Sequence, residues 1–154
     1  MAKRLLIVYH SATGGTAAML DAVVAGARSL ALTEIEICVR TALATGATEV
    51  LGAAGIILGT PENFGYMSGA LKDFFDRIYY PCLERTPGLA YGCFICAGND
   101  GSGAQAAIER IVTGLRWRAV VPAVIARREI GPAELAACGE LGATLAAGID
   151  AGIF

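Results

Sequence analysis

Three hydroxyl side chains and two glycines follow the first apolar run of the chain, with no lysine or arginine among them. The apolar run covers residues 5–9, and residues 11–16 read Ser-Ala-Thr-Gly-Gly-Thr. Where a strand leads into a helix, the free N–H groups and the dipole of the helix N-terminus favour an anion. Glycine lets the backbone approach a ligand, and hydroxyls donate further hydrogen bonds. The pattern predicts a phosphate-binding loop; the alternative is an ordinary Ser/Thr helix cap.

Two further loops contain residues that no helical or strand period explains. Residues 59–68 place Phe64 and Tyr66 in a segment with glycine and proline, and residues 98–103 contain three glycines. Aromatic side chains stack on flat rings, and a glycine-rich backbone can approach a ring edge. The alternatives are a lid that packs on its own loop and a flexible connection with a helix cap at Ser102. With the phosphate-binding loop, these segments predict a site for a flat aromatic cofactor bearing a phosphate.

The elements that position these loops follow from the apolar pattern. Four of five apolar runs are near-continuous, as in strands covered on both faces, while the run at residues 35–39 alternates and fits a sheet edge. The expected strands span residues 5–9, 35–39, 55–59, 90–97 and 119–125. The expected helices span residues 16–30, 68–80, 102–117 and 132–149, with at most a short helix at 48–52.

This alternation of strands and helices predicts an α/β fold. The compact arrangement is a five-stranded parallel sheet in the order 2-1-3-4-5, with right-handed crossovers and helices on both faces. In that order the loops after the first, third and fourth strands meet at one crevice. We call these loops the first loop (residues 10–16), the second loop (residues 59–68) and the third loop (residues 98–103).

Composition and length predict one domain over residues 1–154. Hydrophobic residues make up 55% and charged residues 17%, which excludes a disordered chain and favours a buried interface in a homo-oligomer. The net charge of −2 argues against a nucleic-acid partner. The basic clusters bracket the fifth expected strand and are interpreted as solvated strand ends; they are Arg116, Arg118, Arg127 and Arg128.

No segment approaches the length of a membrane span, and the first apolar run is too short for a signal peptide. We therefore expect a cytoplasmic protein without a membrane partner. Cys93 and Cys96 have the spacing of a redox motif, but residues three apart on a strand point to opposite faces. We expect all five cysteines to be buried reduced thiols; they are Cys38, Cys82, Cys93, Cys96 and Cys138.

The chain resembles the flavodoxin-like FMN-binding family along nearly its whole length. Residues 11–16 resemble the FMN-phosphate loop of that family. Residues 59–61, 64–65 and 67–74 resemble the second loop and the following helix of its NAD(P)H-dependent FMN and quinone reductases. Residues 97–103 resemble the family's third loop less closely.

The resemblance implies a flavodoxin-like three-layer fold and a bound FMN that carries the redox chemistry, so no catalytic acid or base residue is expected. It implies that the first loop holds the FMN phosphate through Ser11, Thr13, Gly14, Gly15 and Thr16. The isoalloxazine would pack against the second loop and form hydrogen bonds near N5, and its pyrimidine side would face the third loop. The residues implied there are Pro61, Glu62, Asn63, Phe64, Gly65, Tyr66, Gly98, Asn99, Asp100 and Gly101.

Three residues or properties depart from the family pattern. Leu20 stands where many relatives carry a small residue. His10 is the only histidine, so the histidine that longer quinone reductases carry beyond the third loop has no counterpart. The net charge of −2 also differs from that of strongly acidic electron-carrier flavodoxins.

Other classes of protein are built on a similar sheet, but this chain lacks the functional residues that each of them requires. A receiver domain needs carboxylates after the first and third strands, a P-loop needs its lysine, and a cysteine phosphatase needs cysteine and arginine in the first loop. The G-x-G-x-x-G fingerprint is absent, and a serine hydrolase would have His10 as its one base.

We therefore expect an NAD(P)H-dependent oxidoreductase that reduces a quinone-like or other small acceptor through FMN. The alternatives are a flavodoxin-type electron carrier that docks on redox proteins and a flavin-binding protein without turnover. Modest charge favours the enzyme, because fast docking of a carrier benefits from a charged face.

Overall fold

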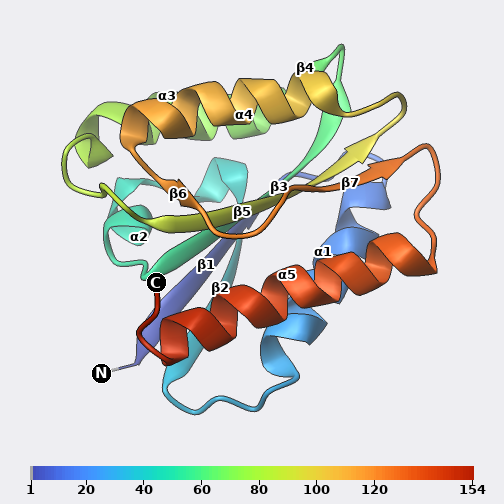
Figure 1. The fold of residues 1–154 in the computed structure, drawn as a ribbon. Helices are drawn as coiled ribbons and strands as arrows, with labels where there is room; N and C mark the ends of the chain where they lie inside the picture. Colours follow the sequence, from blue (N-terminus) through green and yellow to red (C-terminus); the bar gives the residue numbers. More distant parts are fainter. Residues whose placement is uncertain (1) are drawn as a thin grey trace.

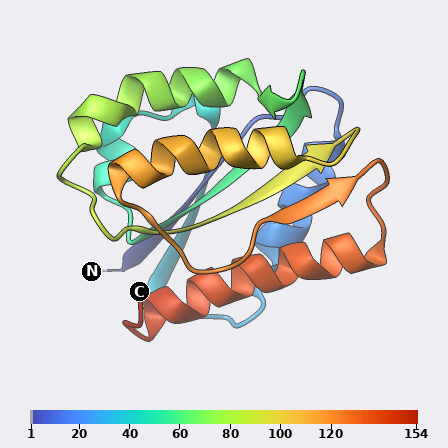
Figure 2. The same ribbon diagram turned by 45° about the horizontal axis from the view of Figure 1, so that its top comes forward.

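The computed structural model describes residues 2–154 as three layers, with a sheet between two layers of helices (Figure 1). One face of the sheet is covered by α1 (Gly15–Arg28) and α5 (Pro132–Asp150). The other face is covered by α3 (Gly69–Cys82) and α4 (Ser102–Leu115), which lie side by side in both views (Figure 2). The short elements η1 (Ala42–Ala44) and α2 (Ala47–Leu51) pack against α3.

The sheet has the predicted parallel order. β2 lies at one edge and is followed by β1, β3 and β5, and the fifth position is shared by β6 and β7, which both pair with β5. The order 2-1-3-4-5 of the five principal positions is therefore confirmed, as is the edge position of residues 35–39. The bounds of these strands are Lys3–Tyr9 (β1), Ile35–Thr41 (β2), Gly55–Asn63 (β3), Ala90–Ala97 (β5), Arg118–Ala119 (β6) and Val124–Arg127 (β7).

The fifth strand is interrupted, whereas the sequence predicted one run over residues 119–125. Tyr91 pairs with Ala119 and Phe94 pairs with Val124, so two residues of β5 face the four residues 120–123. Pro122 lies in this interruption and has no N–H to donate to a neighbouring strand. The break leaves β7 as a short edge strand beside the third loop.

The second loop also differs from the expected irregular segment. β3 continues past residue 59 to Asn63 and forms an antiparallel hairpin with β4 (Tyr66–Met67), in which Glu62 pairs with Met67 and Asn63 with Tyr66. The second loop is therefore an extension of the central strand, and the sheet fixes its direction.

Both faces of the sheet carry buried apolar side chains, which explains the near-continuous apolar runs. The α3–α4 face includes Phe74 and Phe75, and the opposite face includes Phe94. Burial of each such side chain stabilises the fold by about 1.5–3 kcal/mol. This packing holds the carboxyl ends of the strands, and the three loops after them, in fixed positions.

The cysteines follow the expected faces but not the expected burial. Cys93 packs in the cluster under α3 and α4, whereas Cys96 packs against the cluster under α1 and α5, so the pair points to opposite faces. All five cysteines are free thiols. The expectation that all five are buried was wrong for Cys38 and Cys96, which are half-buried because β2 is an edge strand and Cys96 lies near the end of β5.

The two ends of the described chain lie close together at the amino edge of the sheet, opposite the three loops (Figure 1). The Nζ atom of Lys3, the first residue of β1, donates to the carbonyl oxygen of Ile149 in the last turn of α5 at 3.0 Å. Within residues 2–154, no helix combines the length and the apolarity needed to cross a membrane.

Candidate functional site

The first loop leaves unpaired N–H groups at the start of α1. Gly14 is the N-cap residue with φ of 92°, a left-handed conformation that glycine adopts without strain. The alternative of an ordinary Ser/Thr N-cap is not what the structure has, because Gly14 is the N-cap residue, although the Oγ atom of Ser11 does accept from the N–H of Ala17 at 3.3 Å. Within residues 2–154, the N–H groups of Gly15 and Thr16 have no hydrogen-bond acceptor. These two donors and the Ser11 hydroxyl proton remain available to an anion.

The start of α1 lies against the carboxyl end of β5. A Cβ atom on Gly15 would lie 2.7 Å from the Sγ atom of Cys96 and 3.6 Å from the Cδ1 atom of Ile130. Only glycine fits there without displacement of a neighbour. Thr13 and Gly14 are exposed, whereas the side chain of Thr16 is buried beneath the loop. The structure therefore places four of the predicted phosphate-loop residues at the surface of the crevice and one below it.

The hairpin of the second loop is fixed by Thr60. The Oγ1 atom of this buried residue accepts from the N–H of Ser68 at 2.9 Å and donates to the carbonyl oxygen of Pro61 at 2.8 Å. Ser68 in turn caps α3, because its Oγ atom accepts from the N–H of Leu71 at 3.2 Å. These bonds join the base of the hairpin to the helix that follows it.

The tip of the hairpin presents an aromatic side chain to solvent. Phe64 and Gly65 have φ values of 53° and 70°, the positive pair that a two-residue type I′ turn requires. The side chain of Phe64 is fully exposed, and that of Tyr66 is 40% exposed. The alternative in which Phe64 packs on its own loop is therefore wrong.

The second and third loops meet through backbone atoms. A Cβ atom on Gly103 would overlap the carbonyl oxygen of Gly65, so α4 begins directly against the hairpin tip. The Oε2 atom of Glu62 accepts from the N–H of Ala104 at 3.2 Å, which places a carboxylate at the positive end of α4. The first and second loops are also joined, because the N–H of His10 donates to the carbonyl oxygen of Gly59 at 3.0 Å. The predicted convergence of the three loops is confirmed by these contacts.

The third loop is closed by Asp100. Its Oδ1 atom accepts from the N–H of Ser102 at 3.0 Å and from the Oγ atom of Ser102 at 2.8 Å, and these bonds lower the pKa of Asp100. The alternative of a helix cap at Ser102 is wrong, because Ser102 donates both of these bonds and the carboxylate of Asp100 accepts them. Gly101 precedes α4 with φ of 75°, and Gly98 and Asn99 are exposed at the crevice.

The loop after β7 belongs to the same edge, which the sequence analysis missed. The Nε atom of Arg127 donates to the carbonyl oxygen of Asp100 at 3.1 Å, and the N–H of Arg128 donates to the carbonyl oxygen of Ala97 at 2.7 Å. A hollow of about 490 Å³ is lined by Asn99, Asp100, Arg127 and Arg128. The interpretation of these two arginines as solvated strand ends was incomplete. The predicted order could have found them, because the loop after a fifth parallel strand ends at the same edge.

A second hollow, of about 510 Å³, lies beside the first loop and was also missed. It extends from Ser11 and Gly14 to Leu43 in η1. The position of η1 is set by Arg77 of α3, whose Nη1 and Nη2 atoms donate to the carbonyl oxygens of Thr45 at 2.6 Å and Ala42 at 2.9 Å. No periodic pattern reports such a contact, because the partners are more than thirty residues apart.

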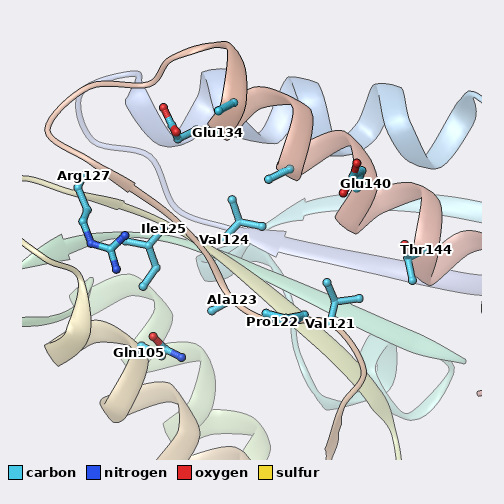
Figure 3. Close-up of a pocket in the computed structure, with 12 residues that line it drawn as sticks. Gln105, Val121, Pro122, Ala123, Val124, Ile125, Arg127, Glu134, Glu140 and Thr144 are labelled. Carbon is cyan, nitrogen blue, oxygen red and sulfur yellow. The ribbon is translucent and has the colours of Figure 1, made fainter.

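A third hollow, of about 490 Å³, follows the free edge of β7 between α4 and α5 (Figure 3). Its floor is apolar and includes Val121, Ala123 and Ile125, and Arg127 and Glu140 lie toward opposite ends of it. All of its lining residues lie outside the three loops, and it shares Arg127 with the hollow beside Asp100. Among residues 2–154, no group of three or more His, Cys, Asp or Glu side chains is arranged to hold a metal ion.

Comparison with known proteins agrees with this geometry. Residues 33–129, more than half of the chain, match the NADPH-dependent FMN reductase family, a match that includes the second and third loops. A flavodoxin from Aquifex aeolicus is 32% identical over 112 residues, which cover 73% of this chain and 60% of that protein. An NAD(P)H dehydrogenase (quinone) from Acidithiobacillus ferrooxidans is 34% identical over 48% of this chain and 46% of its own length.

The chain thus spans about half to three fifths of the length of these curated relatives. Among solved structures, a flavodoxin from the domain Archaea superposes with a TM-score of 0.79 at 20% identity, covering 95% of this chain and 98% of that one, which shows the fold. The chain therefore belongs to the NADPH-dependent FMN reductase family, a family of FMN-binding oxidoreductases with the flavodoxin-like fold.

Proposed function

We propose that this protein binds FMN in the crevice between the three loops and passes reducing equivalents from NAD(P)H to a quinone-like or other small acceptor. The observation that carries the proposal is the pair of unpaired N–H groups at Gly15 and Thr16, in the loop that the His10 N–H joins to Gly59 at the start of the second loop. FMN, when bound, supplies the hydride and electron chemistry. The chain's own residues bind it, orient it and limit its contact with water.

The first loop is the proposed phosphate site. The N–H groups of Gly15 and Thr16 donate along the axis of α1, and the hydroxyls of Ser11 and Thr13 add neutral donors. Since Ser11 already accepts from Ala17, its proton is directed away from the helix and toward the anion. This arrangement neutralises a phosphate monoester without a cation in the loop.

The second and third loops are the proposed ring site. The backbone from Pro61 to Tyr66 is held as a hairpin, so its N–H and C=O groups present a rigid edge for hydrogen bonds to the isoalloxazine. Phe64 and Tyr66 supply apolar surface for the ring faces. Residues 98–100 supply exposed backbone for the pyrimidine side, and Gly101 is buried behind them. Glu62 positions this site through its bond to Ala104, which holds the hairpin against α4.

A second candidate function is a flavodoxin-type electron carrier that docks on redox proteins. The relative from Aquifex aeolicus, which is named flavodoxin, favours it. The chain's net charge of −2 favours the enzyme, because a carrier gains association rate from a strongly charged face.

We also propose that the protein is a homo-oligomer, formed through the hollow along β7 (Figure 3). β7 pairs with β5 on one side and with no other strand of residues 2–154, so its outer edge is free to pair with the same strand of a second copy. An antiparallel pairing about a two-fold axis would bring Arg127 of each copy toward the Glu140 end of the other. The apolar floor would then be covered on both copies.

The experiment that tests the function is an anaerobic spectral titration with FMN, followed by NADPH and NADH. A shift of flavin absorbance on binding, then direct bleaching to the two-electron-reduced form, supports the reductase. A bound flavin that neither nucleotide reduces, but that accepts one electron from a chemical reductant, supports the electron-carrier function. Absence of flavin binding overturns both.

A matched pair of glycine variants tests the phosphate site. Gly15→Val places a side chain against Cys96 at the start of α1 and should weaken FMN binding by about tenfold or more, or abolish it. Gly69→Ala, at the first position of α3, meets no atom within 4 Å and should leave FMN binding unchanged.

A further inference from the structure

The hollow between the first loop and η1, which we call the η1 hollow, lies on the side of β1 opposite to the second loop. Tyr9 ends β1 and pairs with Gly59 of β3 on one side and with Thr41 of β2 on the other. The second loop continues from Gly59, whereas the η1 hollow, of about 510 Å³, is bounded by Thr41 and Leu43. The order of the strands therefore places the first loop between this hollow and the proposed ring site.

We propose that the protein binds FAD as well as FMN, with the FMN half of FAD on the three loops and its adenosine in the η1 hollow. FAD is FMN whose phosphate is joined through a second phosphate to adenosine. The inference rests on the proposed phosphate site at Gly15 and Thr16, and it extends the range of flavin cofactors that this site accepts.

The η1 hollow begins where the phosphate of a bound FMN would end. Ser11 and Gly14, which belong to the proposed phosphate site, also line the hollow, and from them it extends to Leu43. Its volume exceeds that of a phosphate group and lies within the range of about 300–1,000 Å³ that is usual for small-molecule sites. A group joined to the phosphate can therefore enter the hollow while the ring stays on the other side of the first loop.

The outer wall of the η1 hollow is held by hydrogen bonds within the protein. The guanidinium of Arg77 donates to the carbonyl oxygens of Ala42 and Thr45. The Oγ1 atom of Thr45 in turn donates to the carbonyl oxygen of Thr41 at 2.6 Å. These bonds fix η1 and leave the side chain of Leu43 65% exposed at the hollow. A wall that is already formed loses no conformational freedom on binding, which favours affinity.

The lining of the η1 hollow combines the apolar and polar groups that an adenosine requires. Leu43 and Ala17 supply apolar surface on which the face of the base can pack. Tyr9 and Thr41 also line the hollow, and among residues 2–154 their hydroxyl groups have no hydrogen-bond partner. Such hydroxyls can donate to phosphate oxygens or bond the hydroxyls of the ribose.

The charges around the first loop are compatible with the two phosphates of FAD. Each of these phosphates carries one negative charge, whereas the terminal phosphate of FMN carries close to two at neutral pH. Residues 10–16 contain no lysine or arginine, so the loop binds through neutral donors and does not depend on the second charge of a monoester. None of the described residues that line the η1 hollow is an aspartate or glutamate, so no carboxylate in the lining repels the second phosphate.

The position of the η1 hollow also excludes the acceptor as its occupant. An acceptor must reach the isoalloxazine to be reduced, and the proposed ring site lies on the far side of the first loop. A group that occupies the η1 hollow while the flavin is bound therefore has to extend from the phosphate end of the flavin.

The test measures binding of FMN and of FAD to the apoprotein by titration calorimetry. The variant is Leu43→Ser, which removes apolar surface from the wall of the η1 hollow and leaves the first loop unchanged. The control is Leu30→Ser, which removes an exposed leucine just beyond the end of α1 that lies away from the first loop. Because both leucines are exposed, both variants should fold.

Wild-type protein should bind FAD with a dissociation constant no more than about tenfold above that of FMN. Leu43→Ser should weaken FAD binding by about fivefold and leave FMN binding unchanged, while Leu30→Ser should change neither. FAD binding beyond that tenfold limit would overturn the inference, as would FAD binding that Leu43→Ser leaves unchanged or weakens equally with FMN binding. In each of these cases the FMN site stands, whereas a protein that binds neither flavin loses the proposed function as well.

Discussion

At the residue scale, the shape of the crevice depends on glycines whose backbone lies too close to a neighbouring residue to leave room for a side chain. Gly15 contacts Cys96 and Gly103 contacts the carbonyl of Gly65, so a single methyl group would separate elements that form the site. Sequence reasoning identified Gly15 as part of the phosphate loop from its neighbours. It counted Gly103 among the glycines that let the third loop approach a ligand and missed its contact with Gly65, which lies 38 positions away in the sequence.

Substitution of Gly103 by alanine should therefore destabilise the protein. The new Cβ atom would overlap the Gly65 carbonyl, and displacement of the hairpin should cost about 1–3 kcal/mol of unfolding free energy and weaken FMN binding. Urea denaturation of the apoprotein and fluorescence titration with FMN measure the two effects. Gly69→Ala is the matched control, since it also lies in the first turn of a helix but meets no atom, and should be neutral or stabilising by up to about 1 kcal/mol. Equal stability of the two variants would contradict the predicted contact.

The buried thiol of Cys93 and the buried phenol of Tyr91 should make the folded state less stable at high pH. Burial raises the pKa of Cys93 to about 12 and that of Tyr91 to about 12. Because the folded state keeps protons that the unfolded state releases, this contribution to stability is complete below the ordinary pKa values and is lost as pH rises toward 12. Thermal unfolding from pH 8 upward should show a falling midpoint, with a shallower slope in Cys93→Ala. A midpoint independent of pH in this range would be inconsistent with buried neutral groups.

At the element scale, the hairpin of β3 and β4 is the feature that the sequence described least well. Pro61 and the glycines at 59 and 65 predicted an irregular loop, and the Phe64–Gly65 pair is not among the usual type I′ turn sequences. The strand continues because Thr60 and Glu62 bond to Ser68 and Ala104, contacts that no local pattern reports. The apolar runs did predict the strands themselves, because burial on both faces leaves a signature that is local in the sequence.

Replacement of Phe64 by asparagine should separate stability from function. Asparagine before Gly65 is favoured in a type I′ turn, so relief of the positive φ at a bulky residue should stabilise the protein by about 1 kcal/mol. Loss of the exposed ring should weaken FMN binding, because the side chain has no other packing role. Denaturation of the apoprotein measures the change in unfolding free energy, and flavin titration measures the change in FMN affinity. The control is Phe64→Tyr, which keeps both the aromatic ring and the positive φ. A variant that is both less stable and unchanged in FMN affinity would reverse the assignment.

At the scale of the whole molecule, the parallel order explains why four loops share one edge. The sequence predicted three of them; the fourth, at Arg127 and Arg128, was missed because charged residues at a strand end have no periodic signature. The interruption at residues 120–123 was also missed, although Pro122 marks it. Both misses lie on the last strand, where the free edge leaves the chain less constrained by neighbours.

The same free edge predicts the assembly. The mass of the protein in solution, measured by light scattering after size exclusion, should be about twice the 15.8 kDa of the chain or a higher multiple. Ile125→Asp, which places a charge on the apolar floor beside β7, should shift the mass to that of the monomer with FMN binding retained. Val39→Asp on the opposite edge strand β2, where the side chain is exposed, is the control. Wild-type protein at the monomer mass would overturn the oligomer proposal.

The two ends of the described chain lie together at the amino edge of the sheet, where Lys3 donates to Ile149, and the crevice lies at the opposite edge. A linker attached at either end emerges on the side away from the crevice. Joined to a solid support, an electrode or another polypeptide by such a linker, the protein would keep its redox face turned outward. Attachment through either end should therefore leave the crevice accessible to ligands.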